Sequence, residues 1–202
     1  MTEGKVYLNT QVWAVISGVA TEQQAKQALA DSRNRMQTIA RVHEHLYQSS
    51  DLASLDFTTY LRELAVSVFH LYQPTQGSRI QLGFEVEDVR LDINQAIPCA
   101  LITNELLVNS LHHAFPGDRR GLVTLTLRHE PDGRVRLAVG DDGVGLPPGF
   151  DWRKSTSLGL ELVQTLARQI RAEVAVESAP GTRFAATFPL STGKPAKPAN
   201  PS

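Results

Sequence analysis

Residues 135–146 of the chain read Val-Arg-Leu-Ala-Val-Gly-Asp-Asp-Gly-Val-Gly-Leu. The alternating apolar side chains that open this stretch predict a strand ending at Val139. Asp141, Gly143 and Gly145 follow in the adjoining loop. Glycines let a backbone turn tightly and approach a flat ligand closely, and a carboxylate at a strand end can accept a hydrogen bond from an amine. The alternative is an ordinary turn, in which Asp and Gly are frequent.

A second polar motif lies upstream, on a helix predicted over residues 93–114. Glu105 and Asn109 are four residues apart, so their side chains are neighbours on one helix face. A carboxylate beside a carboxamide offers hard oxygen ligands, which suit magnesium bound together with substrate phosphates. The alternative is a solvated helix face, where Glu and Asn at this spacing are common.

Two short segments downstream could complete such a site. Residues 155–163 place Gly159 and Leu160 at the start of a helix predicted over residues 158–170. Free backbone amides and the dipole at a helix N-terminus favour a phosphate group. Thr182 stands directly before the last predicted strand. Taken singly, these segments are equally compatible with a serine-capped helix and a turn.

In this order and on these elements, the four motifs resemble the family of ATPases and kinases that includes histidine kinases, type II topoisomerases, a class of heat-shock chaperones and mismatch-repair ATPases. The resemblance implies a Bergerat-type fold that binds ATP with Mg²⁺. It implies that Asn109 is a magnesium ligand, that Glu105 positions a proton or a water for catalysis, and that Asp141 accepts from the adenine amine. The nucleotide site that it implies also includes Asn104, His112, Gly143, Gly145, Gly159, Leu160 and Thr182.

One position departs from the family pattern. Many related kinases have lysine where His112 stands, three residues after Asn109. Histidine is only partly charged near neutral pH. The difference predicts a lower nucleotide affinity or a lower rate.

The N-terminal region selects a group within the family. Between residues 22 and 48, side chains alternate four and three apart along a heptad-like seam formed by Ala25, Leu29, Ser32, Met36, Ile39, His43 and Leu46. The stretch from Arg35 to Ser49 resembles the second dimerisation helix of the HisKA-2 or HWE-like histidine kinases. This resemblance implies a homodimer and, as a further partner, the receiver domain of a response regulator.

The histidine that such kinases phosphorylate lies on the first helix of the hairpin. This sequence has no histidine before His43, so we expect that it begins after that site or has lost it. His43 is predicted to lie in the helix seam and not to accept phosphate. A natural fragment, a shortened chain and a degenerate kinase remain alternatives.

The predicted fold class is α+β. A two-layer sandwich with helices on one face of a mixed sheet is expected over residues 56–190, after a partial helical hairpin over 1–55 and before a disordered, proline-rich tail over 191–202. Asp56 should cap a helix that runs to about Tyr72 and buries Phe57, Leu61, Leu64, Val68 and Leu71. Further strands are predicted at 80–86, 122–128, 173–178 and 183–189, and Pro98 is expected in the first turn of its helix.

The bulk composition limits the possible partners. With 20 basic and 21 acidic side chains the formal net charge is -1, so nucleic acid and anionic membranes are not expected partners. The apolar stretches are too short to insert into a membrane. The single cysteine, Cys99, excludes an internal disulfide. We expect a cytoplasmic protein.

These features favour the catalytic module of a sensor histidine kinase, which transfers the γ-phosphoryl group of ATP to a histidine for relay to a response regulator. One alternative is a non-catalytic dimeric adaptor or histidine phosphotransfer protein on the same scaffold. Another is a serine kinase of the anti-sigma-factor type, which shares the ATP site but lacks the dimerising hairpin.

Overall fold

The computed structural model describes residues 55–72, 79–155, 157–178 and 180–191, together with Leu29, Ser32, Arg33, Met36 and Ala40. The five isolated residues are helical. The rest of the predicted hairpin, including His43, and the predicted tail after residue 191 lie outside the described residues. No helix in the described part of the chain is long and apolar enough to cross a membrane.

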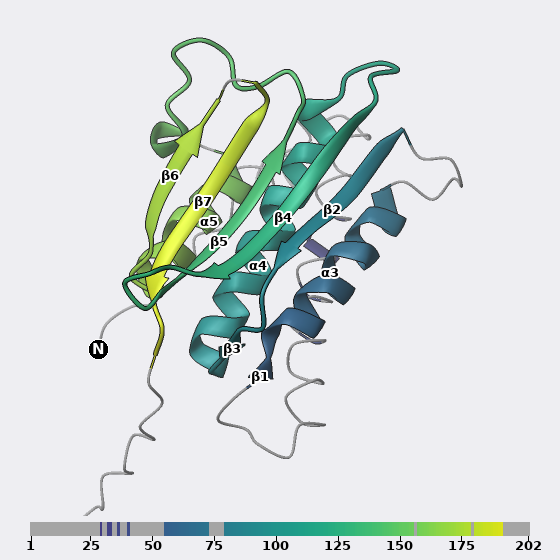
Figure 1. Ribbon diagram of the computed structural model, residues 1–202. Helices are drawn as coiled ribbons and strands as arrows, with labels where there is room; N and C mark the ends of the chain where they lie inside the picture. Colours follow the sequence, from purple (N-terminus) through teal and green to yellow (C-terminus); the bar gives the residue numbers. More distant parts are fainter. Residues whose placement is uncertain are drawn as a thin grey trace, which may run out of the picture.

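A five-stranded sheet forms one layer of the fold (Figure 1). Its strands follow the order β2 (Ile80–Val86), β4 (Gly121–His129), β5 (Arg134–Asp141), β7 (Thr182–Pro189) and β6 (Glu173–Glu177). β2 pairs with β4 in parallel, and every other neighbouring pair in this sheet is antiparallel. The predicted mixed sheet is thereby confirmed.

Three helices cover one face of the sheet: α3 (Phe57–Tyr72), α4 (Ile93–Asn109) and α5 (Leu158–Gln169) (Figure 1). α4 packs against both of the others. The core between the layers contains alternate residues of the strands, such as Val123, Leu125 and Leu127, none of which has exposed surface. The two-layer α+β prediction is therefore confirmed.

α3 begins where the sequence predicted. The carboxylate of Asp56 accepts from the Thr59 amide at 3.1 Å and from the Thr59 hydroxyl at 2.8 Å. The predicted burial of Phe57, Leu61, Leu64 and Val68 is confirmed. The prediction for Leu71 is wrong: this side chain is 46% exposed, because Tyr72 makes the core contact of the last turn.

α4 starts at the predicted residue but differs from the prediction in the place of Pro98 and at its C-terminal end. Asp92 caps it by accepting from the Gln95 amide at 3.1 Å, so the helix starts at Ile93 and Pro98 lies beyond the first turn. The predicted place of Pro98 is therefore wrong, and the helix lacks one hydrogen bond to the Asn94 carbonyl. At its other end α4 continues into a π-helical turn, η1 (Ser110–Ala114).

A short strand pair was not predicted. β1 (Leu55–Asp56) pairs antiparallel with β3 (Arg90–Leu91), which leads directly into α4. The Phe57 amide also donates to the Val89 carbonyl at 3.2 Å. These bonds hold the start of α3 beside the start of α4.

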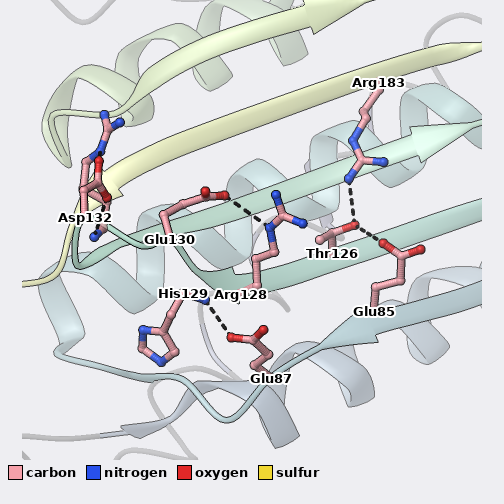
Figure 2. Close-up of polar contacts among 9 residues, drawn as sticks. Glu85, Glu87, Thr126, Arg128, His129, Glu130, Asp132 and Arg183 are labelled. Carbon is pink, nitrogen blue, oxygen red and sulfur yellow. Dashed lines mark hydrogen bonds and ion pairs between the residues drawn. The ribbon is translucent and has the colours of Figure 1, made fainter.

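The other face of the sheet carries a layer of polar side chains (Figure 2). Arg183 donates to the Thr126 hydroxyl at 3.1 Å, and this hydroxyl lies 3.2 Å from a carboxylate oxygen of Glu85. Ala138, two strands from Glu85, has no exposed surface although it does not point into the helix layer. All of the residues predicted for the nucleotide site lie elsewhere, on the helix side or at one end of the strands.

Candidate functional site

A cavity of about 450 Å³ opens between α4, η1, the loop after β5 and the start of α5. Five of the predicted site residues line it: Asn109, Asp141, Gly145, Leu160 and Thr182. Two groups of contacts organise its walls. The first is the Asp141 cluster, formed by Ser110, Asp141, Gly143 and Thr182, and the second is the Gly159 cluster, formed by Glu105, Asn109 and Gly159.

In the Asp141 cluster the protein itself fixes the carboxylate. Oδ2 accepts from the Ser110 hydroxyl at 2.9 Å, while Oδ1 accepts from the amides of Gly143 at 3.1 Å and Thr182 at 3.2 Å. An ionised carboxylate offers about four lone-pair sites. Three of them are filled within the protein, which leaves acceptor capacity for one donor of a ligand in the cavity.

Burial raises the pKa of Asp141 above the ordinary aspartate value of 3.8, although the bonds from Ser110, Gly143 and Thr182 oppose this shift. Desolvation penalises the charged form, whereas donors to the carboxylate stabilise it. The cluster therefore holds a rigid and only partly solvated acceptor.

Glycines are required around this carboxylate for steric reasons. A Cβ atom on Gly143 would lie 2.4 Å from the Ala114 carbonyl oxygen, and the neighbouring Val144 amide donates to that same oxygen at 3.0 Å. Gly181 has a φ of +72°, and a Cβ there would lie 1.8 Å from the Asp141 carbonyl oxygen. The loop after β5 thus packs by its backbone directly against η1 and the start of β7.

In the Gly159 cluster the start of α5 meets the face of α4 that bears Glu105 and Asn109. A Cβ on Gly159 would lie 2.8 Å from Glu105 Oε2 and 3.8 Å from Asn109 Nδ2. Ser157 precedes the helix, and its side chain makes no capping hydrogen bond. The first amides of α5 are therefore not capped by that residue, which suits an anion.

Two family models of known proteins match this chain. Residues 15–72 match a family model described as histidine kinase, and residues 94–192 match one described as histidine kinase-, DNA gyrase B- and HSP90-like ATPase. This chain belongs to the histidine kinase family.

Relatives of this chain include sensor histidine kinase PdtaS of Mycobacterium tuberculosis, 35% identical over 71% of this chain and 28% of that protein. Blue-light-activated histidine kinase 2 of Erythrobacter litoralis is 30% identical over 74% of this chain and 45% of that protein. The chain thus spans less than half the length of these two curated relatives.

Solved structures share the fold of this chain. The histidine kinase domain of a blue-light-activated kinase from Erythrobacter litoralis has a TM-score of 0.72 at 23% identity, covering 90% of this chain and 86% of that one. Full-length ShkA, solved in complex with AMPPNP, has a TM-score of 0.55 at 22% identity, covering 86% of this chain and 40% of that one.

Besides Glu105, Gly143 and Gly159 of the two clusters, two predicted residues do not line the cavity. Asn104 is 2% exposed and donates from Nδ2 to Glu105 Oε1 at 3.3 Å, so it contacts the carboxylate and not the cavity. The ring of His112 packs edge-on against Tyr72, with centroids 4.9 Å apart. Its neighbour His113 lines the cavity instead.

The π-helical turn explains why sequence reasoning placed His112, and not His113, at the site. Each residue of a π-helix advances around the axis by a smaller angle than in an α-helix. A count of three α-helical positions after Asn109 therefore does not give the direction of His112. Ser110 could have been found from its position in the sequence, directly after Asn109. Its hydroxyl donates to the Asp141 carboxylate.

The metal prediction depends on Asn109 and on the ligand. Within the described ranges, no group of three or more His, Cys, Asp or Glu side chains could hold a metal ion alone. Asn109 lines the cavity, and its carboxamide oxygen is a hard donor of the kind that Mg²⁺ accepts beside substrate phosphates. The residues present therefore fit a magnesium ion that arrives with a nucleotide, and they do not form a cage of their own.

Proposed function

We propose that this chain is the ATP-binding catalytic part of a sensor histidine kinase, and that it transfers the γ-phosphoryl group of ATP to a histidine. The observation that carries the proposal is the Asp141 carboxylate, which three internal donors orient and which keeps capacity for one more. The exocyclic amine of adenine is a donor of the required kind, whereas guanine presents a carbonyl acceptor at the equivalent position.

The phosphates would lie at the start of α5. Uncapped amides at a helix N-terminus bind anions, and the hydroxyls of Ser155 and Ser157 also line the cavity there. Asn109 would hold Mg²⁺ together with the phosphates, and the ion would neutralise charge on the transferred group. The AMPPNP complex of ShkA accords with a nucleotide in this fold.

Phosphoryl transfer would form a bond between a ring nitrogen of the acceptor histidine and the γ-phosphorus. It would break the bond from that phosphorus to the oxygen that bridges to the β-phosphate, so that ADP leaves. Glu105, next to the Gly159 backbone, would hold the proton of the attacking ring or a water near it. Positioning and electrostatic stabilisation supply most of the rate in such reactions.

A homodimer belongs to the same proposal. Leu29 and Met36 are helical and expose 67% and 65% of their surface. Both lie on the heptad-like seam, so a second copy of the chain would remove apolar surface from water. Light scattering should give the dimer mass at micromolar concentrations, and a strictly monomeric mass would contradict this part. From the acceptor histidine, the phosphoryl group would pass to the receiver domain of a response regulator.

The test is transfer of labelled phosphate from MgATP to a supplied hairpin that carries the acceptor histidine of a relative. We expect an acid-labile, base-stable product on the hairpin, little labelling of the chain itself, and loss of transfer in Glu105→Gln. Self-labelling that disappears in His43→Ala would instead make His43 the acceptor. ATP binding without either product would favour the non-catalytic adaptor.

A further inference from the structure

We infer that Arg119, which does not line the cavity, is a positioning residue for adenine recognition. It lies in the loop of residues 115–120, between η1 and β4. Its Nη2 atom donates to the carbonyl oxygen of Asp142 at 2.9 Å and to that of Gly143 at 3.3 Å. The inference rests on the proposed function, because it concerns the acceptor that Asp141 offers to adenine.

The peptide group between Asp142 and Gly143 links Arg119 to that acceptor. Its carbonyl oxygen is held by Arg119, and its N–H donates to Asp141 Oδ1 at 3.1 Å. In a planar trans peptide the C=O and N–H bonds point in opposite directions. Holding the oxygen on the outside of the loop therefore directs the N–H towards the carboxylate.

The next peptide group, between Gly143 and Val144, is fixed in the same way. Its carbonyl oxygen accepts from Arg119, while its N–H donates to the Ala114 carbonyl oxygen at 3.0 Å. One guanidinium thus holds both peptide planes that flank Gly143. Charge on the donor makes these bonds stronger than bonds between neutral groups.

Gly143 is the residue whose flanking peptides most need such a restraint. With no side chain, glycine rotates about its backbone bonds more freely than any other residue. Rotation of the Asp142–Gly143 peptide would turn a carbonyl oxygen towards the Asp141 carboxylate, which would repel it and remove one of its three donors. Arg119 opposes that rotation.

The loop that carries Arg119 is itself anchored to the sheet. Arg79, just before β2, donates to the Gly117 carbonyl oxygen and pairs with the Asp118 carboxylate at 2.8 Å. Asp142 Oδ1 accepts from the Leu122 amide at 2.7 Å, which ties the loop after β5 to β4. Arg119 and the two carbonyl groups that it contacts therefore lie on loops that are each hydrogen-bonded elsewhere.

The experiment measures ADP and tripolyphosphate affinities by titration calorimetry in Arg119→Met and Arg119→Lys, with tripolyphosphate measured by competition against ADP. The matched control is Arg120→Met, because Arg120 is the exposed neighbour and makes no side-chain hydrogen bond or ion pair with any residue that the structure describes. We expect Arg119→Met to weaken ADP about tenfold, the order of one lost charge-assisted hydrogen bond. Tripolyphosphate should change less than about twofold, Arg119→Lys should recover part of the loss, and the control should match the wild type.

Two further readouts separate positioning from a general structural role. In the Asp141→Asn background, Arg119→Met should have little additional effect on ADP, because Arg119 acts through that carboxylate. The Gly143 amide should exchange its proton faster in ligand-free Arg119→Met than in the control. Equal losses for ADP and tripolyphosphate, or an Arg119→Met variant indistinguishable from Arg120→Met, would overturn the inference alone. A wild type that binds no ADP at millimolar concentration would overturn the proposed function and this inference with it.

Discussion

The two clusters of the cavity wall differ in how much of their chemistry the protein completes by itself. In the Asp141 cluster, three internal donors fix a charged acceptor before any ligand arrives. In the Gly159 cluster, side-chain oxygens face a helix start that Ser157 leaves uncapped. The described lining of the cavity includes His113 but neither lysine nor arginine. Under the proposed function, the first cluster would select between bases, and the second would depend on the ligand and its ion for charge balance.

The largest expected effect comes from Asp141→Asn. The asparagine oxygen can still accept from the amides of Gly143 and Thr182, but its NH₂ group would then face the adenine amine, donor against donor. We expect ADP affinity to fall about 100-fold, the scale of a mismatched buried hydrogen bond. Tripolyphosphate affinity should change little, and calorimetry with both ligands measures the difference.

Asp142→Asn is the matched control for this substitution. Asp142 is exposed and accepts from the Leu122 amide through one oxygen, a role that asparagine can keep. Burial raises the folded-state pKa of Asp141. Ionising this carboxyl group therefore lowers the free energy of unfolding as the pH rises towards and through that pKa. Asp141→Asn should therefore not destabilise the fold near neutral pH. Equal losses of both ligands would place Asp141 outside the base-binding part.

A methyl group on Gly159 tests the other cluster. In Gly159→Ala the new Cβ would displace the buried Glu105 carboxylate, only 2.8 Å away. We expect phosphoryl transfer from MgATP to fall about tenfold, as for a misplaced catalytic group, while adenosine binds as before. Alanine itself favours helix, so the free energy of unfolding should change by less than about 1 kcal/mol.

Gly83→Ala is the control, because it also adds a methyl group to a glycine. That methyl group would lie on the face of the sheet that the helices do not cover. The new Cβ would meet Leu122 Cδ1 at 3.3 Å, remote from Glu105. Transfer should be unaffected there. If Gly159→Ala transferred phosphate at the wild-type rate, the position of the Glu105 carboxylate beside Gly159 would not matter for phosphoryl transfer.

Ser110→Ala sharpens the comparison through pH. The Ser110 hydroxyl lowers the pKa of Asp141, so its removal should raise that pKa further. Adenine needs the ionised acceptor, and ADP affinity should therefore be lost at a higher pH in Ser110→Ala than in the wild type as the solution is acidified. Near neutral pH the loss should be only about threefold. ADP affinity is measured against pH for both proteins, and the ratio of the two profiles removes the effect of protonation of the nucleotide itself. Identical profiles for Ser110→Ala and the wild type would contradict the role of Asp141 as the adenine acceptor.

The smallest effect is expected from the histidines of η1. His113 lines the cavity while His112 packs on Tyr72. His113→Ala should weaken MgATP about two- to threefold through one lost weak contact. His112→Ala should leave nucleotide affinity unchanged and lower the melting temperature instead. The reverse result would restore the sequence-based assignment of His112.

Sequence reasoning succeeded where a short pattern has one physical meaning. The alternation at Ile80, Leu82 and Phe84 fixed β2, and the Asp56 cap fixed the start of α3. Asp141 and Thr182 were predicted to share one site, and the Thr182 amide donates to the Asp141 carboxylate. These residues are informative because strand period, helix cap and glycine loop each demand particular residue types.

It failed where tertiary contacts decide the geometry. No local sequence pattern indicates that α4 ends in a π-helical turn. This turn determines which histidine lines the cavity. Pro98 was assigned to the first turn, although it is the sixth residue of a helix that was correctly predicted to start at residue 93. The two-residue strands β1 and β3 carry no period, and Arg119 has no motif at all, since its function depends on two backbone carbonyls distant in sequence.

Cys99 gives this chain an internal reporter of its own opening. The thiol has no exposed surface in the middle of α4, and burial raises its pKa far above the ordinary value. Since the thiolate is the species that attacks disulfide reagents, Cys99 should not react with them in the native state. It is also the sole cysteine of the sequence. The rate of Cys99 labelling therefore measures how often α4, the helix that bears Asn109, separates from the sheet. If a bound nucleotide slows the labelling, the change in rate measures how strongly the nucleotide stabilises the packing of the helices on the sheet.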